Sequence, residues 1–330
     1  MAQRLAPMLD ELPETVRHSA LPTPFPVGPV NCWLLAERPV TVVDPGMYLP
    51  ESLGMIEDLL AAEGLAVADV DRVLITHAHP DHFGAAGWIA ENSRATVFCG
   101  EAERPKIIDA PMDRDLALAV VVDLGLPDDV IAMLPAGLEM LRRMIRHPVP
   151  ERVEGLADGD AFEAGGRTWS VHVTPGHAQG HVSLHDGDAG VLVSGDHLLA
   201  HITPNPALEL DATVAGGRRP SLVEYLANLD RFAKLDPAAV LPGHGAAFHD
   251  VPALVAAMHE HHARRADRIL ELVDDMGTSS VYEISQVLFP SLNGMDVMLG
   301  LSEVVGHLDL LERSGAVLRT SAAPVLYAAA

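Results

Sequence analysis

The residues best suited to chemistry lie in one short segment, which reads Thr76-His77-Ala78-His79-Pro80-Asp81-His82. It places three imidazoles and one carboxylate within six residues, directly after the apolar run 73–75. Each neutral imidazole offers one lone pair and the carboxylate offers charged oxygen donors. This mixture suits zinc, iron or manganese better than magnesium or calcium. The segment therefore predicts a transition-metal site at the end of a strand.

Three later predicted strands also end in candidate ligands, and each ligand directly follows a glycine. These ligands are His177, Asp196 and His244. Strands of a packed sheet fix where a loop begins, while a glycine lets the backbone turn sharply and approach a metal closely. We therefore expect these three side chains to help position the metal.

Alternating strand and helix patterns predict the scaffold around the first segment. Strands are expected at 30–37, 40–44, 72–76 and 95–99, and helices at about 55–60 and at 83–91. The turn Asp44-Pro45-Gly46 closes the second of these strands. Such βαβ alternation predicts an α/β fold around a layered core.

The stretch from about 101 to 150 changes to amphipathic helical patterns without a strand signal, and we interpret it as a helical insertion. Its helices are expected to break at Pro111, Pro127 and Pro135. A helix is expected at 221–234, with Ser221 and Glu224 placed for a capping box. Further strands are expected at 161–162, 168–173, 181–185, 190–194 and 239–241.

The segment 254–330 is expected to form a C-terminal module, after a catalytic domain that covers 1–253. Helices are expected at 254–275 and 295–312, with a short helix between them that begins at Ser280 and Glu283. A small hairpin is expected at 317–318 and 325–327. Three helices followed by a hairpin resemble a winged-helix module.

Composition limits the classes of partner. The 330 residues are 48% hydrophobic and 21% charged, which is an ordinary globular balance. The net charge of −24 disfavours nucleic acids and anionic membranes as partners. We expect no membrane span, no signal peptide and a cytoplasmic location. The two cysteines, Cys32 and Cys99, imply no disulfide framework.

The ligand-type residues and their order resemble the metallo-β-lactamase superfamily over roughly 25–247. The resemblance rests on His77-x-His79-x-Asp81-His82, Gly176-His177, Gly195-Asp196 and Pro242-Gly243-His244, together with Asp44 in its turn. It implies an αββα sandwich with a two-metal site on one edge. The stretch 195–199 is similar to a bacterial subgroup of glyoxalase-II-like and β-lactamase-like 2 hydrolases, which names no substrate.

The resemblance also implies a role for each residue. One metal would be held by His77, His79 and His177, the second by Asp81, His82 and His244, with Asp196 bridging them. Asp44 would orient ligands from outside the metal shell. The two ions are expected to be zinc, with iron or manganese as alternatives.

Two cations would make acyl-bond hydrolysis the natural reaction. A hydroxide bridging them would be available near neutral pH and would attack the acyl carbon, while the cations stabilise the oxyanion. Asp81 is the candidate to hand a proton to the leaving group. The aspartate at position 196, where many zinc β-lactamases have a cysteine, disfavours antibiotic hydrolysis and favours a thioester, ester or lactone.

Substrate selectivity is expected in the helical insertion, whose apolar residues could form a lid or simply a core of the insertion. Arg142, Arg143 and Arg146 could bind an anionic group, for example on an acyl-CoA, although a solvated helix face is the preferred interpretation. Further pocket candidates are Tyr48, His201 and Tyr225.

Two other functions remain open. A metal-dependent phosphodiesterase or ribonuclease would use the same ligands, and some related RNA endonucleases end in a winged-helix module. However, the segment 259–330 has five arginines against ten acidic residues, so it is not basic. The other alternative is non-hydrolytic: a mononuclear iron dioxygenase of the persulfide type, or a regulator. We expect a small-molecule acyl substrate as the partner, and allow for a homodimer.

Overall fold

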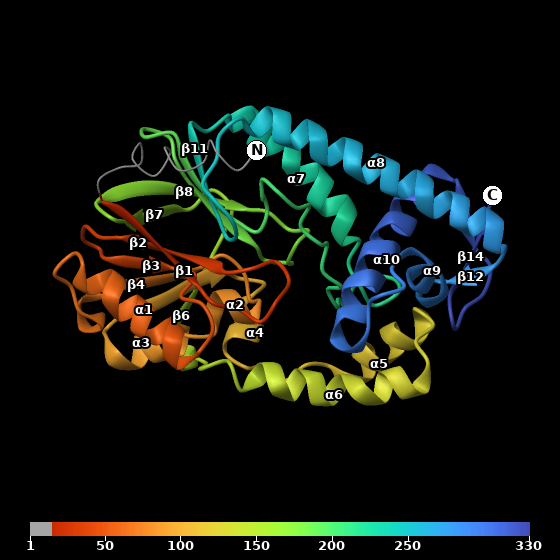
Figure 1. The fold of residues 1–330 in the computed structure, drawn as a ribbon, viewed down its shortest axis with the longest axis horizontal. Helices are drawn as coiled ribbons and strands as arrows, with labels where there is room; N and C mark the ends of the chain where they lie inside the picture. Colours follow the sequence, from red (N-terminus) through yellow and green to blue (C-terminus); the bar gives the residue numbers. More distant parts are fainter. Residues whose placement is uncertain (1–14) are drawn as a thin grey trace.

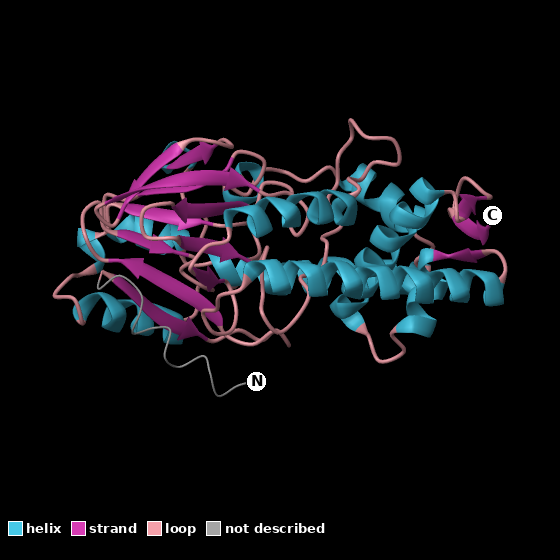
Figure 2. Cartoon of the chain, turned by 90° about the horizontal axis from the view of Figure 1, so that it is seen from above, coloured by secondary structure: helices cyan, strands magenta, loops and turns pink. Residues whose placement is uncertain are grey.

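Two β-sheets packed face to face form one end of the molecule, and helices form the other (Figures 1 and 2). The computed structural model describes residues 15–330. The first sheet has the order β1-β2-β3-β4-β5-β6 and the second has the order β11-β10-β9-β8-β7. The strands of the first sheet are β1 (Val16–Leu21), β2 (Val30–Leu35), β3 (Thr41–Val43), β4 (Arg72–Ile75), β5 (Thr96–Gly100) and β6 (Val153–Leu156). The strands of the second are β7 (Ala161–Ala164), β8 (Arg167–Val173), β9 (Val182–Asp186), β10 (Val191–Gly195) and β11 (Ala239–Pro242).

Apolar side chains fill the space between the sheets and beneath the helices that cover them. Trp33 and Leu74 of the first sheet pack with Trp169 and Leu184 of the second. The outer face of the first sheet packs against α1 (Pro50–Ala61) and α3 (Ala86–Asn92), and that of the second against α7 (Ser221–Leu235) and α8 (Val251–Met276). This is the predicted αββα sandwich.

The structure corrects several expected elements. Strands β1 and β6 were not predicted, because in both only the two end residues are buried and the middle is polar or contains glycine. Pro135 does not break a helix but lies inside α6 (Asp128–Arg142). The expected capping box at Ser221 does not form, because Pro220 is the N-cap residue and the Glu224 carboxylate instead pairs with Arg219.

The helical insertion contains α4 (Arg104–Ile107), α5 (Arg114–Asp123) and α6. Helix α5 does not form a core of its own. Its Val120 and Val121 are buried together with Leu301 and Leu308 of α10 (Val297–Ser314). The backbone reinforces this contact, since the Leu124 carbonyl accepts a hydrogen bond from Tyr282 at 2.9 Å. The insertion is therefore packed onto the C-terminal segment.

The C-terminal segment has the predicted three helices and a small sheet. Along the chain, α8 is followed by β12 (Ser279–Ser280), α9 (Val281–Leu288), α10, β13 (Val317–Arg319) and β14 (Leu326–Ala329), and the sheet order is β12-β14-β13. The capping box is formed, with Ser280 Oγ accepting from Glu283 N at 3.2 Å. The winged-helix assignment and the domain division at 253 stay predictions.

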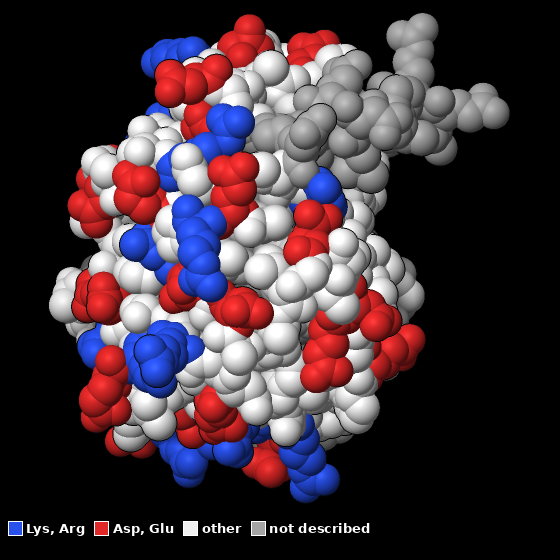
Figure 3. Space-filling view, turned by 90° about the vertical axis from the view of Figure 1, so that its left-hand side faces the viewer, with Lys and Arg blue, Asp and Glu red and all other residues white. Residues whose placement is uncertain are grey.

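Charges are mixed on the end of the molecule away from the C-terminal segment. In Figure 3, the Lys and Arg side chains on this face are interleaved with Asp and Glu rather than gathered into one patch. Within the described residues, no helix is long and apolar enough to cross a membrane.

Candidate metal centre

All seven candidate ligands come from strand ends that meet at one edge of the sandwich. His77 and His79 lie in the loop after β4, and Asp81 and His82 lie in the following short helix α2 (Pro80–Phe83). Strand β4 is parallel to both its neighbours, so its carboxyl end lies beside theirs. The second sheet contributes from the ends of β8, β10 and β11, which carry His177, Asp196 and His244.

The ligand atoms form two groups, one from each half of the centre, and His77, His82 and Asp196 form a third group that links them. Those of His77, His79 and His177 all lie within 4.8 Å of one another, as do those of Asp81, His82 and His244. Within the first group, the ring nitrogens are 2.8, 3.1 and 3.2 Å apart. A tetrahedral ion with bonds of about 2.0–2.1 Å to nitrogen would set its ligands about 3.3 Å apart. The first group thus has nearly the spacing of a metal site.

Asp196 lies between the two groups. Its Oδ2 is 3.5 Å from Nε2 of His82, 3.6 Å from Nε2 of His177 and 3.6 Å from Nε2 of His244. Asp81 Oδ2 is 3.4 Å from His244 Nε2. One carboxylate oxygen is therefore shared by ligand atoms of both groups.

Unpaired buried atoms show that the residues fit a cation. Among residues 15–330, His82 Nε2, His244 Nε2 and Asp196 Oδ1 are buried without a hydrogen-bond partner. Such atoms are costly unless something binds them. The combination of imidazole and carboxylate donors suits a divalent transition metal.

Hydrogen bonds from outside the groups fix which ring nitrogen faces inward. Asp44 accepts from the Thr76 backbone N–H at 2.8 Å and from His82 Nδ1 at 2.9 Å. His177 Nδ1 donates to the Asn205 carbonyl, and His244 Nδ1 to the Pro29 carbonyl, both at 2.8 Å. When Nδ1 donates, Nε2 has its lone pair free for a metal. Asp44 therefore occupies the orienting position that the resemblance implied.

Close packing explains why glycine precedes two of the later ligands, His177 and His244. Gly176 has a φ of +139°, and a Cβ there would lie 2.4 Å from the Tyr225 Cα. A Cβ on Gly243 would lie 2.1 Å from Asp196 Oδ1. Both contacts are shorter than any side chain tolerates, so the close approach predicted from the sequence is present.

Burial keeps the imidazoles of His77, His79 and His177 neutral, whereas at His82 and His244 the neighbouring carboxylates outweigh burial and raise the pKa above its ordinary value. Burial lowers the pKa of His79 to about 3, and burial followed by the charge of His82 lowers the pKa of His77 well below its usual range. For Asp81 and Asp196, burial raises the pKa, but the neighbouring histidines, His82 foremost, bring both below the ordinary value. Neutral imidazole and ionised carboxylate are the forms that bind metals. An ionised Asp81 suits a ligand better than a proton donor, and its proton-donor role stays a prediction.

One important residue was missed by the sequence reasoning. Glu103, at the start of the insertion, has a fully buried carboxylate. It accepts from the backbone N–H of Ala78 at 3.0 Å and from that of Gly180 at 2.7 Å. Ala78 separates His77 from His79, and Gly180 lies three residues after His177. Glu103 therefore ties together the two loops that form the first ligand group.

Lys106 extends this cluster on the same side of the centre. Its Nζ lies 3.4 Å from Glu103 Oε2 and 2.6 Å from Glu209 Oε1. Glu209 in turn accepts from the Gln179 backbone N–H at 3.3 Å. No sequence motif signals these contacts, because the partners are far apart in the chain.

The predicted substrate residues have varied positions. Arg142, Arg143 and Arg146 are exposed and pair with Asp109, Glu139 and Glu91 respectively, which agrees with a solvated face. Tyr225 is fully buried and donates to the His197 carbonyl at 3.0 Å, so its hydroxyl is already engaged inside the protein. Tyr48 is 37% exposed. Their roles in substrate binding stay predictions.

His201, another predicted substrate residue, lines a cavity. This open cavity has a volume of about 490 Å³ and is lined by the loop after β10 and by residues of the C-terminal segment. A Cβ on Gly245 would lie 2.4 Å from His201 Cε1, and Gly245 directly follows His244. The cavity therefore adjoins the metal centre.

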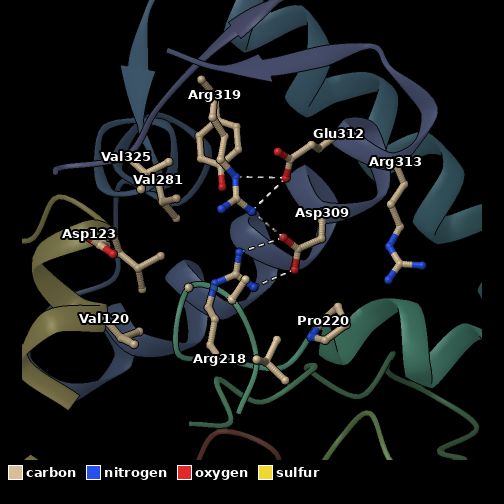
Figure 4. A pocket seen from close by; sticks show the side chains of 15 residues that line it. Val120, Asp123, Arg218, Pro220, Val281, Asp309, Glu312, Arg313, Arg319 and Val325 are labelled. Atoms are coloured by element: carbon tan, nitrogen blue, oxygen red, sulfur yellow. Dashed lines mark hydrogen bonds and ion pairs between the residues drawn. The ribbon is translucent and has the colours of Figure 1, made fainter. Parts of the chain in front are cut away.

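A second cavity of about 260 Å³ lies between α5, α10 and the C-terminal hairpin (Figure 4). Arg218 donates to both oxygens of Asp309, at 2.6 and 2.7 Å. Arg319 lies 2.8 Å from Glu312, and these side chains point toward one another in Figure 4. Because both arginines are paired with acids, we interpret the lining of this cavity as structural ion pairs within the C-terminal half.

Comparison with known proteins agrees with this geometry. The chain is 29% identical to the probable metallo-hydrolase YqjP of Bacillus subtilis, over 90% of this chain and 92% of that protein. It is 32% identical to the uncharacterized protein Rv2581c of Mycobacterium tuberculosis, over 68% of this chain and 90% of the relative. The structure of the metallo-beta-lactamase family protein TTHA1429 from Thermus thermophilus superposes with a TM-score of 0.82 and 30% identity, covering 96% of this chain and 99% of that one.

A family model agrees with these likenesses. The model of the metallo-beta-lactamase superfamily matches residues 25–244, which include every candidate ligand described above. The superfamily and the His and Asp groups together indicate a divalent metal-binding site. The chain belongs to the metallo-beta-lactamase superfamily.

Proposed function

We propose that this protein is a dinuclear metal hydrolase that cleaves an acyl bond in a thioester, ester or lactone. The observation that carries the proposal is the position of Asp196, whose Oδ2 lies 3.5–3.6 Å from ligand atoms of both histidine groups. A shared carboxylate oxygen is what two neighbouring ions require. One ion would be held by His77, His79 and His177, the other by Asp81, His82 and His244. Zinc is the ion we propose, with iron and manganese as alternatives.

Two such ions supply a nucleophilic hydroxide near neutral pH and polarise a carbonyl oxygen. The protein's own residues perform the remaining tasks. Asp44, Asn205 and Pro29 hold the imidazoles in the orientation that presents Nε2 to the centre. Glu103 holds the loops of His77 and His177 next to each other. Rigid placement of this kind lets the reacting groups meet without reorganisation.

A relative and the adjoining cavity support an acyl substrate. The chain is 23% identical to the atrochrysone carboxyl ACP thioesterase of Aspergillus fumigatus, over 72% of this chain and 42% of that protein. The cavity beside His201 is large enough for an acyl chain. We therefore place thioesters first among the three bond types.

The test combines metal analysis with a substrate panel. We expect two metal ions per chain, and faster hydrolysis of acyl-CoA or glutathione thioesters than of lactones or RNA. Asp196→Ala should lose bound metal and at least about 100-fold in activity. Asp188→Ala, in an exposed turn, is the matched control.

Three results would contradict the proposal. One iron per chain with oxygen-dependent turnover would favour the dioxygenase, and RNA as the best substrate would favour the nuclease. An Asp196→Ala variant with wild-type activity would remove the shared-carboxylate mechanism.

A further inference from the structure

The cavity beside the metal centre is built largely by the C-terminal segment. Its walls come from the loop after β10, from α8, from the end of α9 and from α10. In Figure 1, α8 begins over the second sheet and runs along the molecule to the C-terminal end, and α10 lies in the helical half away from the sandwich. The C-terminal helices are therefore placed to contact whatever enters the cavity.

Asn205 links this cavity directly to a metal ligand. Its backbone carbonyl accepts the hydrogen bond from His177 Nδ1 at 2.8 Å. Its side-chain amide donates to the Leu299 carbonyl of α10 at 2.9 Å, and its Oδ1 accepts from Ser302 Oγ. One residue thus forms part of the cavity wall and orients a ligand, so a molecule bound in the cavity lies next to the metal centre.

The lining combines apolar side chains with polar groups and one guanidinium. Ile202 and Leu299 are 41% and 48% exposed, so the cavity offers accessible apolar surface to a ligand. The Arg265 guanidinium lies 5.1 Å from the centre of the Phe289 ring. An apolar stem with a charged end is the chemistry that such a lining matches.

Arg265 retains hydrogen-bonding capacity. Its nearest acid is Glu303, with Nε 3.5 Å from Oε1, which is longer than a good hydrogen bond. Among residues 15–330, no hydrogen bond is formed by the terminal nitrogens of Arg265. Burial, opposed by the charge of Arg265, raises the pKa of Glu303. In a chain with a net charge of −24, this lining has two histidines and an arginine against a single acid.

We infer that this cavity binds the part of the substrate that extends from the scissile bond, and that Arg265 binds an anionic group at the far end of an apolar stem. The inference rests on the proposed acyl hydrolysis and assigns the C-terminal segment a role in specificity. Two sources can supply the anionic group. It is either a second carboxylate on the acyl chain or a carboxylate or phosphate of the leaving group.

The experiment measures binding to the metal-loaded full-length protein by calorimetry, without turnover. The acyl arm compares succinate, adipate and suberate with butyrate, hexanoate and octanoate, so that each diacid has a monoacid of equal length. The leaving-group arm uses glutathione and coenzyme A. We expect at least one diacid to bind about tenfold more tightly than the monoacid of equal length, or else glutathione or coenzyme A to bind measurably.

Variants then assign the effect to Arg265. Arg265→Gln should abolish the preference, whereas Arg264→Gln should keep it, because Arg264 is 62% exposed, pairs with Glu260 and does not line the cavity. Leu299→Glu adds a negative charge to the same cavity and should weaken diacids more than monoacids. This second variant leaves Arg265 intact, so it remains informative if Arg265→Gln unfolds.

The arms separate the possible outcomes. Loss of the diacid preference in Arg265→Gln places the anionic group on the acyl chain, and loss of glutathione or coenzyme A binding places it on the leaving group. Equal binding of all matched pairs by wild type, or no effect of either variant, would overturn the inference. Because no turnover is measured, failure of the hydrolase proposal would appear separately, in the substrate panel.

Discussion

Glu103→Gln tests whether a buried carboxylate outside the metal groups positions the ligands. In the wild type, the two carboxylate oxygens accept one backbone N–H from each ligand loop, at 3.0 and 2.7 Å. Glutamine has nearly the same shape, but its NH₂ group would face one of these N–H donors. One loop would then have an unsatisfied buried donor, and Lys106 would lose the weaker of its two carboxylate contacts.

The expected cost follows from these contacts. Leaving a buried donor unsatisfied costs about 1–3 kcal/mol, and the loss of charge from the second hydrogen bond adds to this. We expect metal affinity to fall about 10–100-fold, as for other residues that support ligands from outside the metal shell. Thermal stability should fall as well, and kcat should change more than KM, because Glu103 does not line the cavity beside His201.

The assay is metal content after equilibration in zinc buffers of defined free concentration, together with kcat and KM. Glu101→Gln is the matched control, because Glu101 lies two residues away and is exposed. If Glu103→Gln bound zinc with wild-type affinity while only its melting temperature fell, Glu103 would be a stabilising residue without a role in positioning the ligands.

Two further predictions concern a glycine and a pair of histidines. Gly243→Ala should reduce metal content and activity at a cost of about 1–3 kcal/mol, because its Cβ would overlap Asp196 Oδ1; Gly187→Ala, with its nearest atom at 3.8 Å, is the control, and equal metal content in both variants would contradict the steric reasoning. Burial lowers the pKa of His262 to about 3 and the pKa of His307 to about 4, from an ordinary value of 6.5. Below about pH 6.5, these histidines therefore bind more protons in the unfolded chain than in the folded one. The contribution to stability is therefore complete above about pH 6.5 and falls toward pH 4, by up to about 1.4 kcal/mol per pH unit for each histidine. Urea unfolding at several pH values should show a flatter profile in the double His→Gln variant, and an unchanged slope would refute the burial of neutral imidazoles.

The meeting of the candidate ligands at one edge could be predicted because each position depends on local sequence. His77, His177 and His244 follow predicted strands, and the two later ones follow a glycine that allows a close approach. Parallel and antiparallel pairing then brings these strand ends to one edge. Glu103 could not be predicted in the same way. Its partners Ala78 and Gly180 offer only backbone N–H groups, which have no signature in a sequence.

The same limit applies to the C-terminal segment, where helical periodicity shows an apolar face but not its partner. Leu124 and Leu301 were assigned to separate modules, yet they are buried in one core. A consequence follows for the active site. Helix α10 holds Asn205 through Ser302, and Asn205 orients His177, so a shift of α10 would move a candidate metal ligand through Asn205. Removing the C-terminal segment should therefore impair metal binding as well as specificity.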